Sequence, residues 1–330
     1  MGLRLPDKWI WDFWLVRHGG RHHVFYLQAP RALGEPVLRH RNASVGHAVS
    51  ADLTEWDVLP DALRPGPPGS WDDLAIWTGS AIEHDGRWSM LYTGVTRADG
   101  GLIQRIGLAI SDDLVHWTKH AANPVLEADP RWYEQLDLTR WRDQSWRDPC
   151  VFRLPGDRFF HALITARSRT GSADGAGVLA HARSVDLTEW EVLPPVTVEG
   201  EFAQVEVPQL VRLNGRYEIL VSCLAEDHSS ERRARLGVPG QTGTFILSAD
   251  APLGPYSPAT GPVLAPDGPL GPLYAGKLVE TEPGDWRFLA FRGDGDRAFL
   301  GELTDPLPVR HQEDGGIVVE VPTGPLEPVS

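Results

Sequence analysis

Short runs of aromatic and aliphatic residues recur along the chain, and each follows a turn that contains glycine. The pattern is clearest at 20–26, where Gly-Arg-His-His leads into Val-Phe-Tyr, and at 86–92, where Gly-Arg-Trp-Ser leads into Met-Leu-Tyr. Three further copies begin at Gly156, Gly215 and Gly284, so the turns are 66, 70, 59 and 69 residues apart. Tight turns between runs rich in β-branched and aromatic residues predict β-hairpins.

A second motif follows each hairpin and predicts two more strands. Small residues alternate with larger ones in the first of them, and an Asp-Leu-x-x-Trp sequence then leads into an outer strand at 52–56, 113–117 and 186–190. Weaker copies fall at 244–250 and 299–303. The aspartate suits a turn, because its carboxylate can accept hydrogen bonds from backbone N–H groups there. We therefore interpret these aspartates as structural.

Each repeat thus contains four strands, and five repeats fill the 330 residues. Four-stranded units repeated around an axis form a β-propeller, which typically has four to eight blades. The sequence therefore predicts an all-β protein with one domain over residues 1–330, a five-bladed β-propeller with four-stranded antiparallel blades. The segment 130–145 carries few strand signals and predicts a short helix.

Composition and charge narrow the range of partners. The formal net charge is −14 at pH 7, which argues against a nucleic-acid-binding surface and against acidic polymers as substrates. Two cysteines are too few for a disulfide framework or a zinc site, and we expect no metal and no cofactor. The first residues resemble neither a signal peptide nor a membrane span, so a cytoplasmic location without a membrane partner is expected.

Three carboxylates occupy the strand before a hairpin, which is the strand expected to line the central channel. They are Asp12, Asp148 and Glu206, and Thr78 and Tyr274 take the same place in the other two repeats. The five positions are 66, 70, 58 and 68 residues apart, as the repeat requires. We therefore expect equivalent side chains that converge at one end of the channel, in a central funnel-shaped active site. Carboxylates in such apolar surroundings need a partner or a chemical task, because burying an unpaired charge is costly.

The sequences around these positions resemble those of glycoside hydrolase families 32 and 68, the invertases, levanases and levansucrases. The motifs are Trp-Asp-Phe-Trp at 11–14, Trp-Thr-Gly-Ser-Ala at 77–81, Arg-Asp-Pro at 147–149, Glu-Val-Pro at 206–208 and Leu-Tyr-Ala at 273–275. In family 32 a β-sandwich follows the propeller, and we expect none within residues 1–330. The resemblance implies a retaining glycoside hydrolase, or a fructosyltransferase, that cleaves β-fructofuranosidic bonds by double displacement.

The resemblance also implies a role for each carboxylate. Asp12 would be the nucleophile, Glu206 the general acid/base, and Asp148 the residue that stabilises the transition state by binding fructose hydroxyls. A retaining pair has its carboxyl groups ~5–5.5 Å apart. Apolar neighbours and the charges of Asp12 and Asp148 are expected to raise the pKa of Glu206 and keep it protonated. The expected substrate-binding residues are Arg147, Trp77, Thr78, Ser80, Gln28, Trp14 and Tyr274.

Most of these binding residues also have a plain structural explanation. Thr78, Ser80 and Tyr274 suit packing at a crowded axis as well as sugar binding, and Trp14 suits the core equally. Gln28 lies one residue after the place where the family has a glutamine, and a slip of one residue reverses the face of a strand.

Two connections are expected to border the pocket. The polar loop 39–42 would be either a solvated face or a rim at the pocket mouth. The insert 129–145 contains three aromatic residues and is expected to cover one side of that mouth, next to the leaving-group subsite.

Two other functions stay open at this stage. One is an arabinofuranosidase or xylosidase of a neighbouring five-bladed family, which inverts configuration with carboxyls ~6.5–9.5 Å apart. The other is a non-catalytic sugar-binding propeller. For a fructosidase, the partner would be a small or oligomeric sugar, such as sucrose, a fructo-oligosaccharide or a levan- or inulin-type chain. The sequence leaves hydrolysis versus transfer, exo versus endo action and the oligomeric state open.

Overall fold

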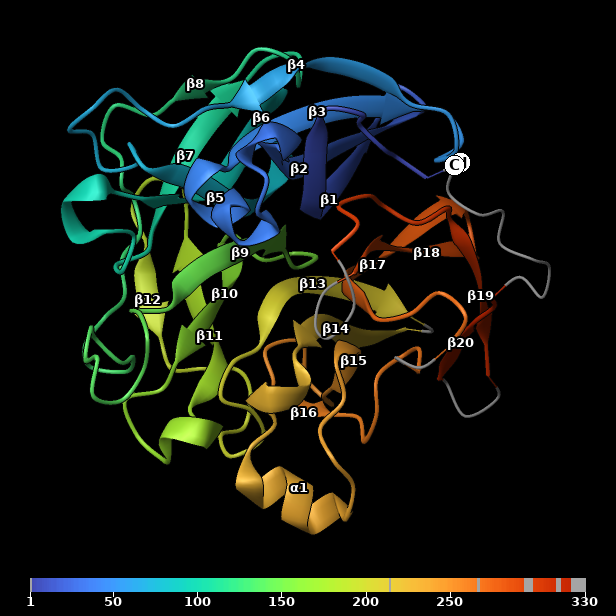
Figure 1. The fold of residues 1–330 in the computed structure, drawn as a ribbon. Coiled ribbons are helices and arrows are strands. Elements are labelled where there is room, and N and C mark those ends of the chain that lie inside the picture. The colour runs from blue at the N-terminus through green and yellow to red at the C-terminus, as the bar shows by residue number, and fades with distance from the viewer. Residues whose placement is uncertain (1, 214, 266–267, 294–298, 313–315, 322–330) are drawn as a thin grey trace.

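Five four-stranded antiparallel sheets surround a central axis in the computed structural model (Figure 1). The structure describes residues 2–321 apart from 214, 266–267, 294–298 and 313–315. Each sheet follows the chain order from its innermost to its outermost strand, so the predicted five-bladed β-propeller is confirmed. The blades are β1 (Lys8–His18), β2 (Arg21–Pro30), β3 (Ser44–Ser50) and β4 (Asp57–Leu63); β5 (Ala75–His84), β6 (Arg87–Val95), β7 (Arg105–Ser111) and β8 (Thr118–Lys119); β9 (Trp146–Arg153), β10 (Phe160–Arg167), β11 (Gly177–Ser184) and β12 (Glu191–Leu193); β13 (Glu206–Leu213), β14 (Arg216–Cys223), β15 (Gly243–Ser248) and β16 (Ser257–Pro258); β17 (Leu273–Glu282), β18 (Asp285–Arg292), β19 (Leu307–His311) and β20 (Ile317–Val319).

The helical turns of the described residues all lie in connections between the second and third strands of a blade. Equivalent connections share one end of a propeller, so these turns border one mouth of the channel. In the described part of the chain, no helix is long and apolar enough to cross a bilayer. The helical turns are the 3-10 turns Arg31–Leu33, Pro36–Asn42, Arg97–Asp99, Ala173–Gly175 and Ala225–Asp227 and the helix α1 (Ser230–Leu236).

The helix predicted at 130–145 is wrong, because this segment consists of turns and bends. Asp129 Oδ1 accepts a hydrogen bond from the backbone N–H of Arg131 at 2.8 Å, and Asp137 Oδ1 accepts one from that of Thr139 at 3.0 Å. Aspartate side chains that capture nearby backbone N–H groups compete with the helical pattern and favour turns.

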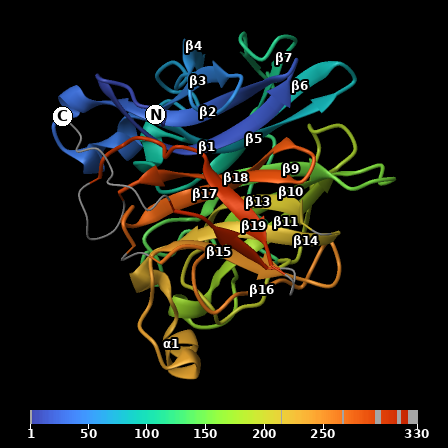
Figure 2. The same ribbon diagram turned by 90° about the vertical axis from the view of Figure 1, so that its right-hand side faces the viewer.

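The segment 299–303 is also not the third strand of the fifth blade, a place taken by β19. It closes the ring instead. The carbonyl of Gly301 accepts from the N–H of Ile10 at 3.0 Å, and the N–H of Leu303 donates to the carbonyl of Leu3 at 3.0 Å. Figure 2 shows β1 beside β18 at this junction. The first blade is thereby tied to the last one by backbone hydrogen bonds.

Every inner strand contains a β-bulge near its first residues, marked by a register shift in β1, β5, β9, β13 and β17, and β17 has a second shift between Glu280 and Glu282. A bulge inserts one extra residue and redirects the neighbouring side chains. In the last three of these strands a residue other than glycine takes the left-handed conformation there. These residues are Asp148, Val207 and Ala275, with φ of 56°, 53° and 52°.

The positions of the bulges show that the five inner-strand residues expected to be equivalent are not all at the same place in the repeat. Asp12, Thr78 and Asp148 lie at the bulge of their strands, as expected. Glu206 and Tyr274 precede the bulge of β13 and β17 by one place, because they still pair with the neighbouring strand. The five positions therefore share one end of the axis without being strictly equivalent.

The aspartates of the Asp-Leu-x-x-Trp motif cap turns, as predicted. Asp52 Oδ1 accepts from the backbone N–H groups of Thr54 and Glu55 at 2.8 and 3.0 Å, and Asp186 makes the matching pair of bonds. These backbone hydrogen bonds hold the pKa of both carboxyl groups below its usual value. The motif thus serves the fold and leaves the chemistry to the inner strands.

Candidate active site

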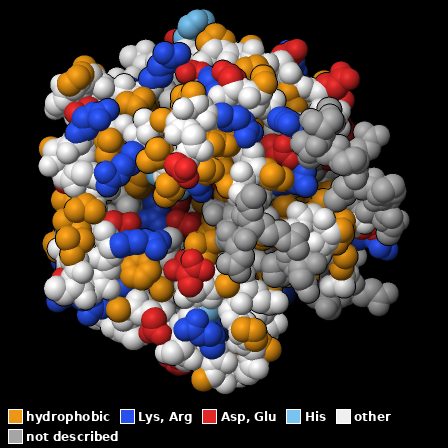
Figure 3. Space-filling view, viewed as in Figure 1, with side chains coloured by type: hydrophobic (Ala, Val, Ile, Leu, Met, Phe, Trp, Pro, Cys, Tyr) orange, Lys and Arg blue, Asp and Glu red, His pale blue; other side chains and the backbone are white. Residues whose placement is uncertain are grey.

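Asp12, Asp148 and Glu206 lie around the same end of the axis, on β1, β9 and β13. Arg147 links two of them, because its Nη2 donates to Glu206 Oε1 at 2.7 Å and its Nε lies 3.7 Å from Asp148 Oδ2. Figure 3 shows a hollow near the middle of one face in which acidic and basic side chains meet. The predicted convergence of the three carboxylates is therefore observed.

Asp12 accepts fewer hydrogen bonds from the described residues than the other two carboxylates do. It is half-buried, and Thr78 Oγ1 donates to its Oδ2 at 2.9 Å. Burial, and then the charges of Asp148 and Glu206, raise the pKa of Asp12 to about 8, whereas the Thr78 hydrogen bond opposes this rise. Near neutral pH, a proton therefore resides on Asp12 in the free site.

Asp148 is buried and held from two sides. Its Oδ2 accepts from Thr165 Oγ1 at 3.0 Å and from the backbone N–H of Val207 at 3.2 Å. Burial raises the pKa of Asp148, and the charge of Arg147 works in the opposite direction. These bonds join the third blade to the fourth and fix the Asp148 carboxylate in one orientation.

Both carboxylate oxygens of Glu206 accept strong hydrogen bonds. Arg147 donates to Oε1, and the hydroxyl of Tyr274 donates to Oε2 at 2.6 Å. Burial works to raise the pKa of Glu206, but the Arg147 charge and the Tyr274 hydroxyl outweigh it, so the pKa lies below its usual value. The expectation of a raised pKa is therefore wrong for the free site. The apolar neighbours on which it rested count for less than a guanidinium in direct contact.

Three of the seven predicted binding residues contact the carboxylates directly: Arg147, Thr78 and Tyr274. Trp77 is half-buried, and its Nε1 donates to the carbonyl of His40 at 2.7 Å. His40 belongs to the 3-10 turn Pro36–Asn42, and the charges of Glu206 and Arg147 act on its ring, so the loop 39–42 lies near the carboxylates.

The other three predicted binding residues are used within the fold. Ser80 Oγ donates to the carbonyl of Pro149 at 2.6 Å, which ties β5 to β9. Trp14 is buried and stacks on Phe25 with ring centroids 5.9 Å apart. Gln28 is also buried, and it bonds to three side chains of its own blade, those of Lys8, Ser44 and Asp61.

Two charged residues near the pocket were not among the predicted site residues. The Arg39 guanidinium lies 4.0 Å from the ring centre of Phe299, and its charge opposes the rise in the pKa of Asp12. Asp227 is buried, and among the described residues its Oδ2 has no hydrogen-bond partner. Burial and then the charge of Glu206 raise the pKa of Asp227 to about 6. Only the polar character of the loop 39–42 hinted at Arg39, and no motif marks Asp227.

The insert 129–145 brings a further cation to this side. Arg142 donates to Gln204 Oε1 at 3.1 Å and lies 4.8 Å from the ring centre of Trp141. Its charge is close enough to lower the pKa of Glu206. The end of the insert therefore lies near the acid/base candidate, where it was expected to border the mouth.

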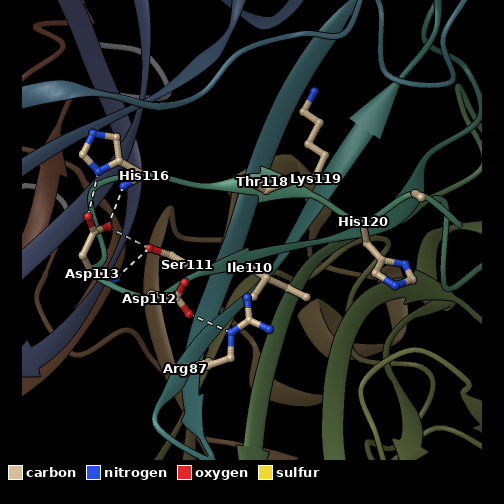
Figure 4. A pocket seen from close by; sticks show the side chains of 10 residues that line it. Arg87, Ile110, Ser111, Asp112, Asp113, His116, Thr118, Lys119 and His120 are labelled. Carbon is tan, nitrogen blue, oxygen red and sulfur yellow. Dashed lines mark hydrogen bonds and ion pairs between the residues drawn. The ribbon is translucent and has the colours of Figure 1, made fainter.

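A separate cavity of about 500 Å³ lies on the second blade (Figure 4). Its basic residues are already neutralised: Arg87 bonds to Asp112 at 2.7 Å, and Lys119 bonds to the buried Asp72 at 2.5 Å. The cavity lacks the three carboxylates of the inner strands. The end of the axis, where the three carboxylates lie, is therefore the candidate active site.

The model of the glycosyl hydrolases family 32 N-terminal domain matches residues 6–244, which is more than half of the chain. The chain belongs to glycosyl hydrolase family 32. This confirms the resemblance on which the three carboxylates were first assigned.

Curated relatives of this family 32 chain include a β-fructofuranosidase and a fructan exohydrolase. β-Fructofuranosidase 1 of Zea mays is 33% identical over 194 residues, which are 57% of this chain and 26% of that protein. Fructan 6-exohydrolase of Triticum aestivum is 32% identical over 200 residues, 58% of this chain and 31% of that protein. The chain spans less than a third of the length of these two relatives.

Solved structures share the propeller. An inulosucrase from Halalkalicoccus jeotgali bound to kestose superposes with a TM-score of 0.77 at 24% identity, over 96% of this chain and 87% of that chain. A family 32 β-fructofuranosidase of Bombyx mori gives a TM-score of 0.70 at 23% identity, over 99% of this chain and 64% of that chain. At these identities the likeness concerns the fold.

Replacing Arg147 with methionine in this family 32 site should destabilise the protein by about 3–5 kcal/mol, because it leaves a buried carboxylate without its partner. Urea unfolding at neutral pH measures the change. Arg87→Met is the matched control, since its ion pair with Asp112 is exposed and contributes about 0–1 kcal/mol. Equal losses in the two variants would contradict the proposed importance of the Arg147 contact.

Proposed function

We propose that this chain is a retaining glycoside hydrolase that cleaves β-fructofuranosidic bonds, with Asp12 as nucleophile, Glu206 as general acid/base and Asp148 as transition-state stabiliser. The observation that carries the proposal is the convergence of these three carboxylates at one end of a family 32 propeller, where Arg147 bridges Asp148 and Glu206. Relatives solved with sucrose and with kestose support a fructose-containing oligosaccharide as the substrate.

The proposed reaction has two displacements. Asp12 attacks the anomeric carbon of the fructosyl unit while Glu206 donates its proton to the departing glycosidic oxygen, which leaves a fructosyl ester on Asp12. Glu206 then takes a proton from water, and the resulting hydroxide equivalent releases fructose and restores both carboxyl groups. Asp148, fixed by Thr165 and Val207, is oriented to bind ring hydroxyls as positive charge develops on the sugar.

The reaction requires a proton on Glu206, whereas in the free site the proton lies on Asp12 at neutral pH. Since a guanidinium cannot accept a proton, we infer that the reactive proton sits on Oε2 of Glu206, beside Tyr274. Rotation of the Tyr274 hydroxyl breaks its hydrogen bond to Oε2, and the proton on Oε2 can then be donated to the leaving-group oxygen. The active form is then the one-proton tautomer of the pair, with the proton on Glu206.

An arabinofuranosidase or xylosidase and a non-catalytic sugar-binding protein are the competing functions. The family membership favours a fructosidase over both. Hydrolysis versus transfer depends on how water and sugar acceptors compete beside Arg142 and Asp227. The cytoplasmic location and the absence of a cofactor stay predictions from the sequence.

The active one-proton form makes the pH profile of kcat/KM bell-shaped, with a basic limb near the pKa of Asp12, about 8. Thr78→Val removes a hydrogen bond that stabilises ionised Asp12, so its pKa rises and the basic limb should move to higher pH by about 0.5–1 unit. Thr281→Val, which removes a hydroxyl bonded to Asp285, is the control. A basic limb that stays in place or moves to lower pH would refute this assignment of the proton.

Asp12→Asn and Glu206→Gln should each lower turnover about 10²–10⁶-fold while the circular dichroism spectrum stays unchanged. Sucrose, levan, inulin and aryl arabinofuranosides are offered to the wild-type protein, and products are resolved by NMR. We expect release of fructose with its β configuration retained. Cleavage with inversion, or fructose release by both variants at the wild-type rate, contradicts the proposed mechanism, and fructose from none of the sugars contradicts the proposed function.

A further inference from the structure

A buried lysine on an inner strand lies within electrostatic reach of Asp12 and Asp148. Lys277 belongs to β17, three residues after Tyr274, and is only 4% exposed. Its Nζ donates to the carbonyls of Val207 and Pro208 at 2.7 and 3.4 Å. Among the described residues it forms no ion pair within 4 Å of a carboxylate, so its contacts are directed at the backbone of the neighbouring blade.

The register of the inner strands defines the layer in which Lys277 lies. In every blade, the first residue after the bulge pairs again with the second strand. These five residues take equivalent places in the register, and four of them are uncharged. The five are Phe13, Gly79, Cys150, Gln209 and Lys277. Lys277 is therefore the one cation at this position of the five blades.

The peptide that Lys277 holds is conformationally unusual. Val207 has φ of 53°, and a β-branched residue in the left-handed region is a genuine outlier that its surroundings must maintain. Its N–H donates to Asp148 Oδ2 at 3.2 Å, while its carbonyl accepts from Lys277. Both ends of this residue, which directly follows Glu206, are thus held by charged side chains.

The other two left-handed residues of the inner strands are held differently. The N–H of Asp148 donates to Thr93 Oγ1 at 3.0 Å, and that of Ala275 donates to Ser222 Oγ at 2.9 Å. Neutral hydroxyl groups from the preceding blade suffice at these two places. At Val207, by contrast, the backbone is held by the Asp148 carboxylate and the Lys277 ammonium.

The charges around Lys277 suit this task. Burial lowers the pKa of Lys277 to about 8, while Cys150, Asp12 and Asp148 work to raise it. The side chain is therefore protonated at neutral pH, and two backbone carbonyls accept its N–H donors. Above about pH 8 it loses one of these protons along with its charge.

We propose that Lys277 is a positioning residue, which acts through the Val207 peptide to aim Glu206 at the leaving-group oxygen. The proposal rests on the fructosidase function proposed above. It concerns a residue that touches neither the sugar nor the reacting atoms, and it explains why an ammonium is buried without a carboxylate partner. Misplacing a catalytic group by about 1 Å can slow a reaction about a hundredfold.

The first test compares Lys277→Met with Lys119→Met. Methionine keeps the length of the side chain and removes its charge and its donors. Lys119→Met removes the ion pair with the buried Asp72, which lies away from the three carboxylates. Both variants therefore lose a buried lysine contact, and both are expected to be less stable than the wild type. On a fructoside that the wild type cleaves, Lys277→Met should lower kcat about 10–100-fold with KM changed less than about threefold. Lys119→Met should leave kcat unchanged.

The second test asks whether the effect passes through Val207. Glycine adopts the left-handed conformation without the strain of a side chain. In a Val207→Gly background, the loss of kcat caused by Lys277→Met should therefore shrink at least about threefold. An equal loss in both backgrounds, or a wild-type kcat in Lys277→Met, would overturn the proposal.

A crystal structure of Lys277→Met supplies a readout that needs no activity. Val207 is expected to leave the left-handed region, with a displaced Glu206 carboxylate. If Val207 and Glu206 stay in place, the positioning role is wrong whatever the substrate is. If the wild type cleaves no fructoside but Val207 leaves the left-handed region in Lys277→Met, the proposed reaction is wrong. The inference that Lys277 holds the Val207 peptide is then still supported.

Discussion

The structure depends on placing three carboxylates at one crowded end of a propeller axis. Charges of the same sign in a low-dielectric site repel one another, and each also loses hydration on burial. Arg147 relieves part of this cost by lying between Asp148 and Glu206. Thr78, Thr165 and Tyr274 supply one further donor to each carboxylate. Asp12 receives the least help, and it is therefore the group that retains a proton.

The bulges of the inner strands are the backbone counterpart of this arrangement. They turn consecutive residues toward the axis, so that Arg147 and Asp148 both reach the same site from one strand. Left-handed residues at Asp148 and Val207 carry the strain, and hydrogen bonds from neighbouring blades hold them there. The fold thus links the geometry of the acid/base to contacts between blades.

Much of this could be predicted from the sequence, because the repeat is regular. The turn at Gly20 and its four counterparts define the blades, and the spacing from Asp12 to Asp148 defines the inner strands. The bulge offset of Glu206 could not be predicted, since a count of residues does not reveal where pairing slips by one place. The low pKa of Glu206 was missed for a related reason, because it depends on the direction in which Arg147 points. Ser80 was assigned to the substrate, but its hydroxyl joins two strands.

Two charged residues near the candidate acid/base bear on the leaving-group side of the pocket. Arg142 from the insert and Asp227 from the fourth blade both lie within electrostatic reach of Glu206. A buried carboxylate with a raised pKa beside the acid/base is suited to accept hydrogen bonds from sugar hydroxyls. These two residues are the first places to look for the selectivity of the leaving-group subsite.

The central claim is that Asp12 forms a covalent bond to the fructosyl unit. The most direct measurement is mass spectrometry of the Glu206→Gln variant after mixing with fructosyl fluoride. Fluoride leaves without acid assistance, and the second displacement is slow without the base. If Asp12 is the nucleophile, one fructosyl unit accumulates on the peptide that contains Asp12. Release of fluoride with no adduct, and with fructose of inverted configuration, would contradict it.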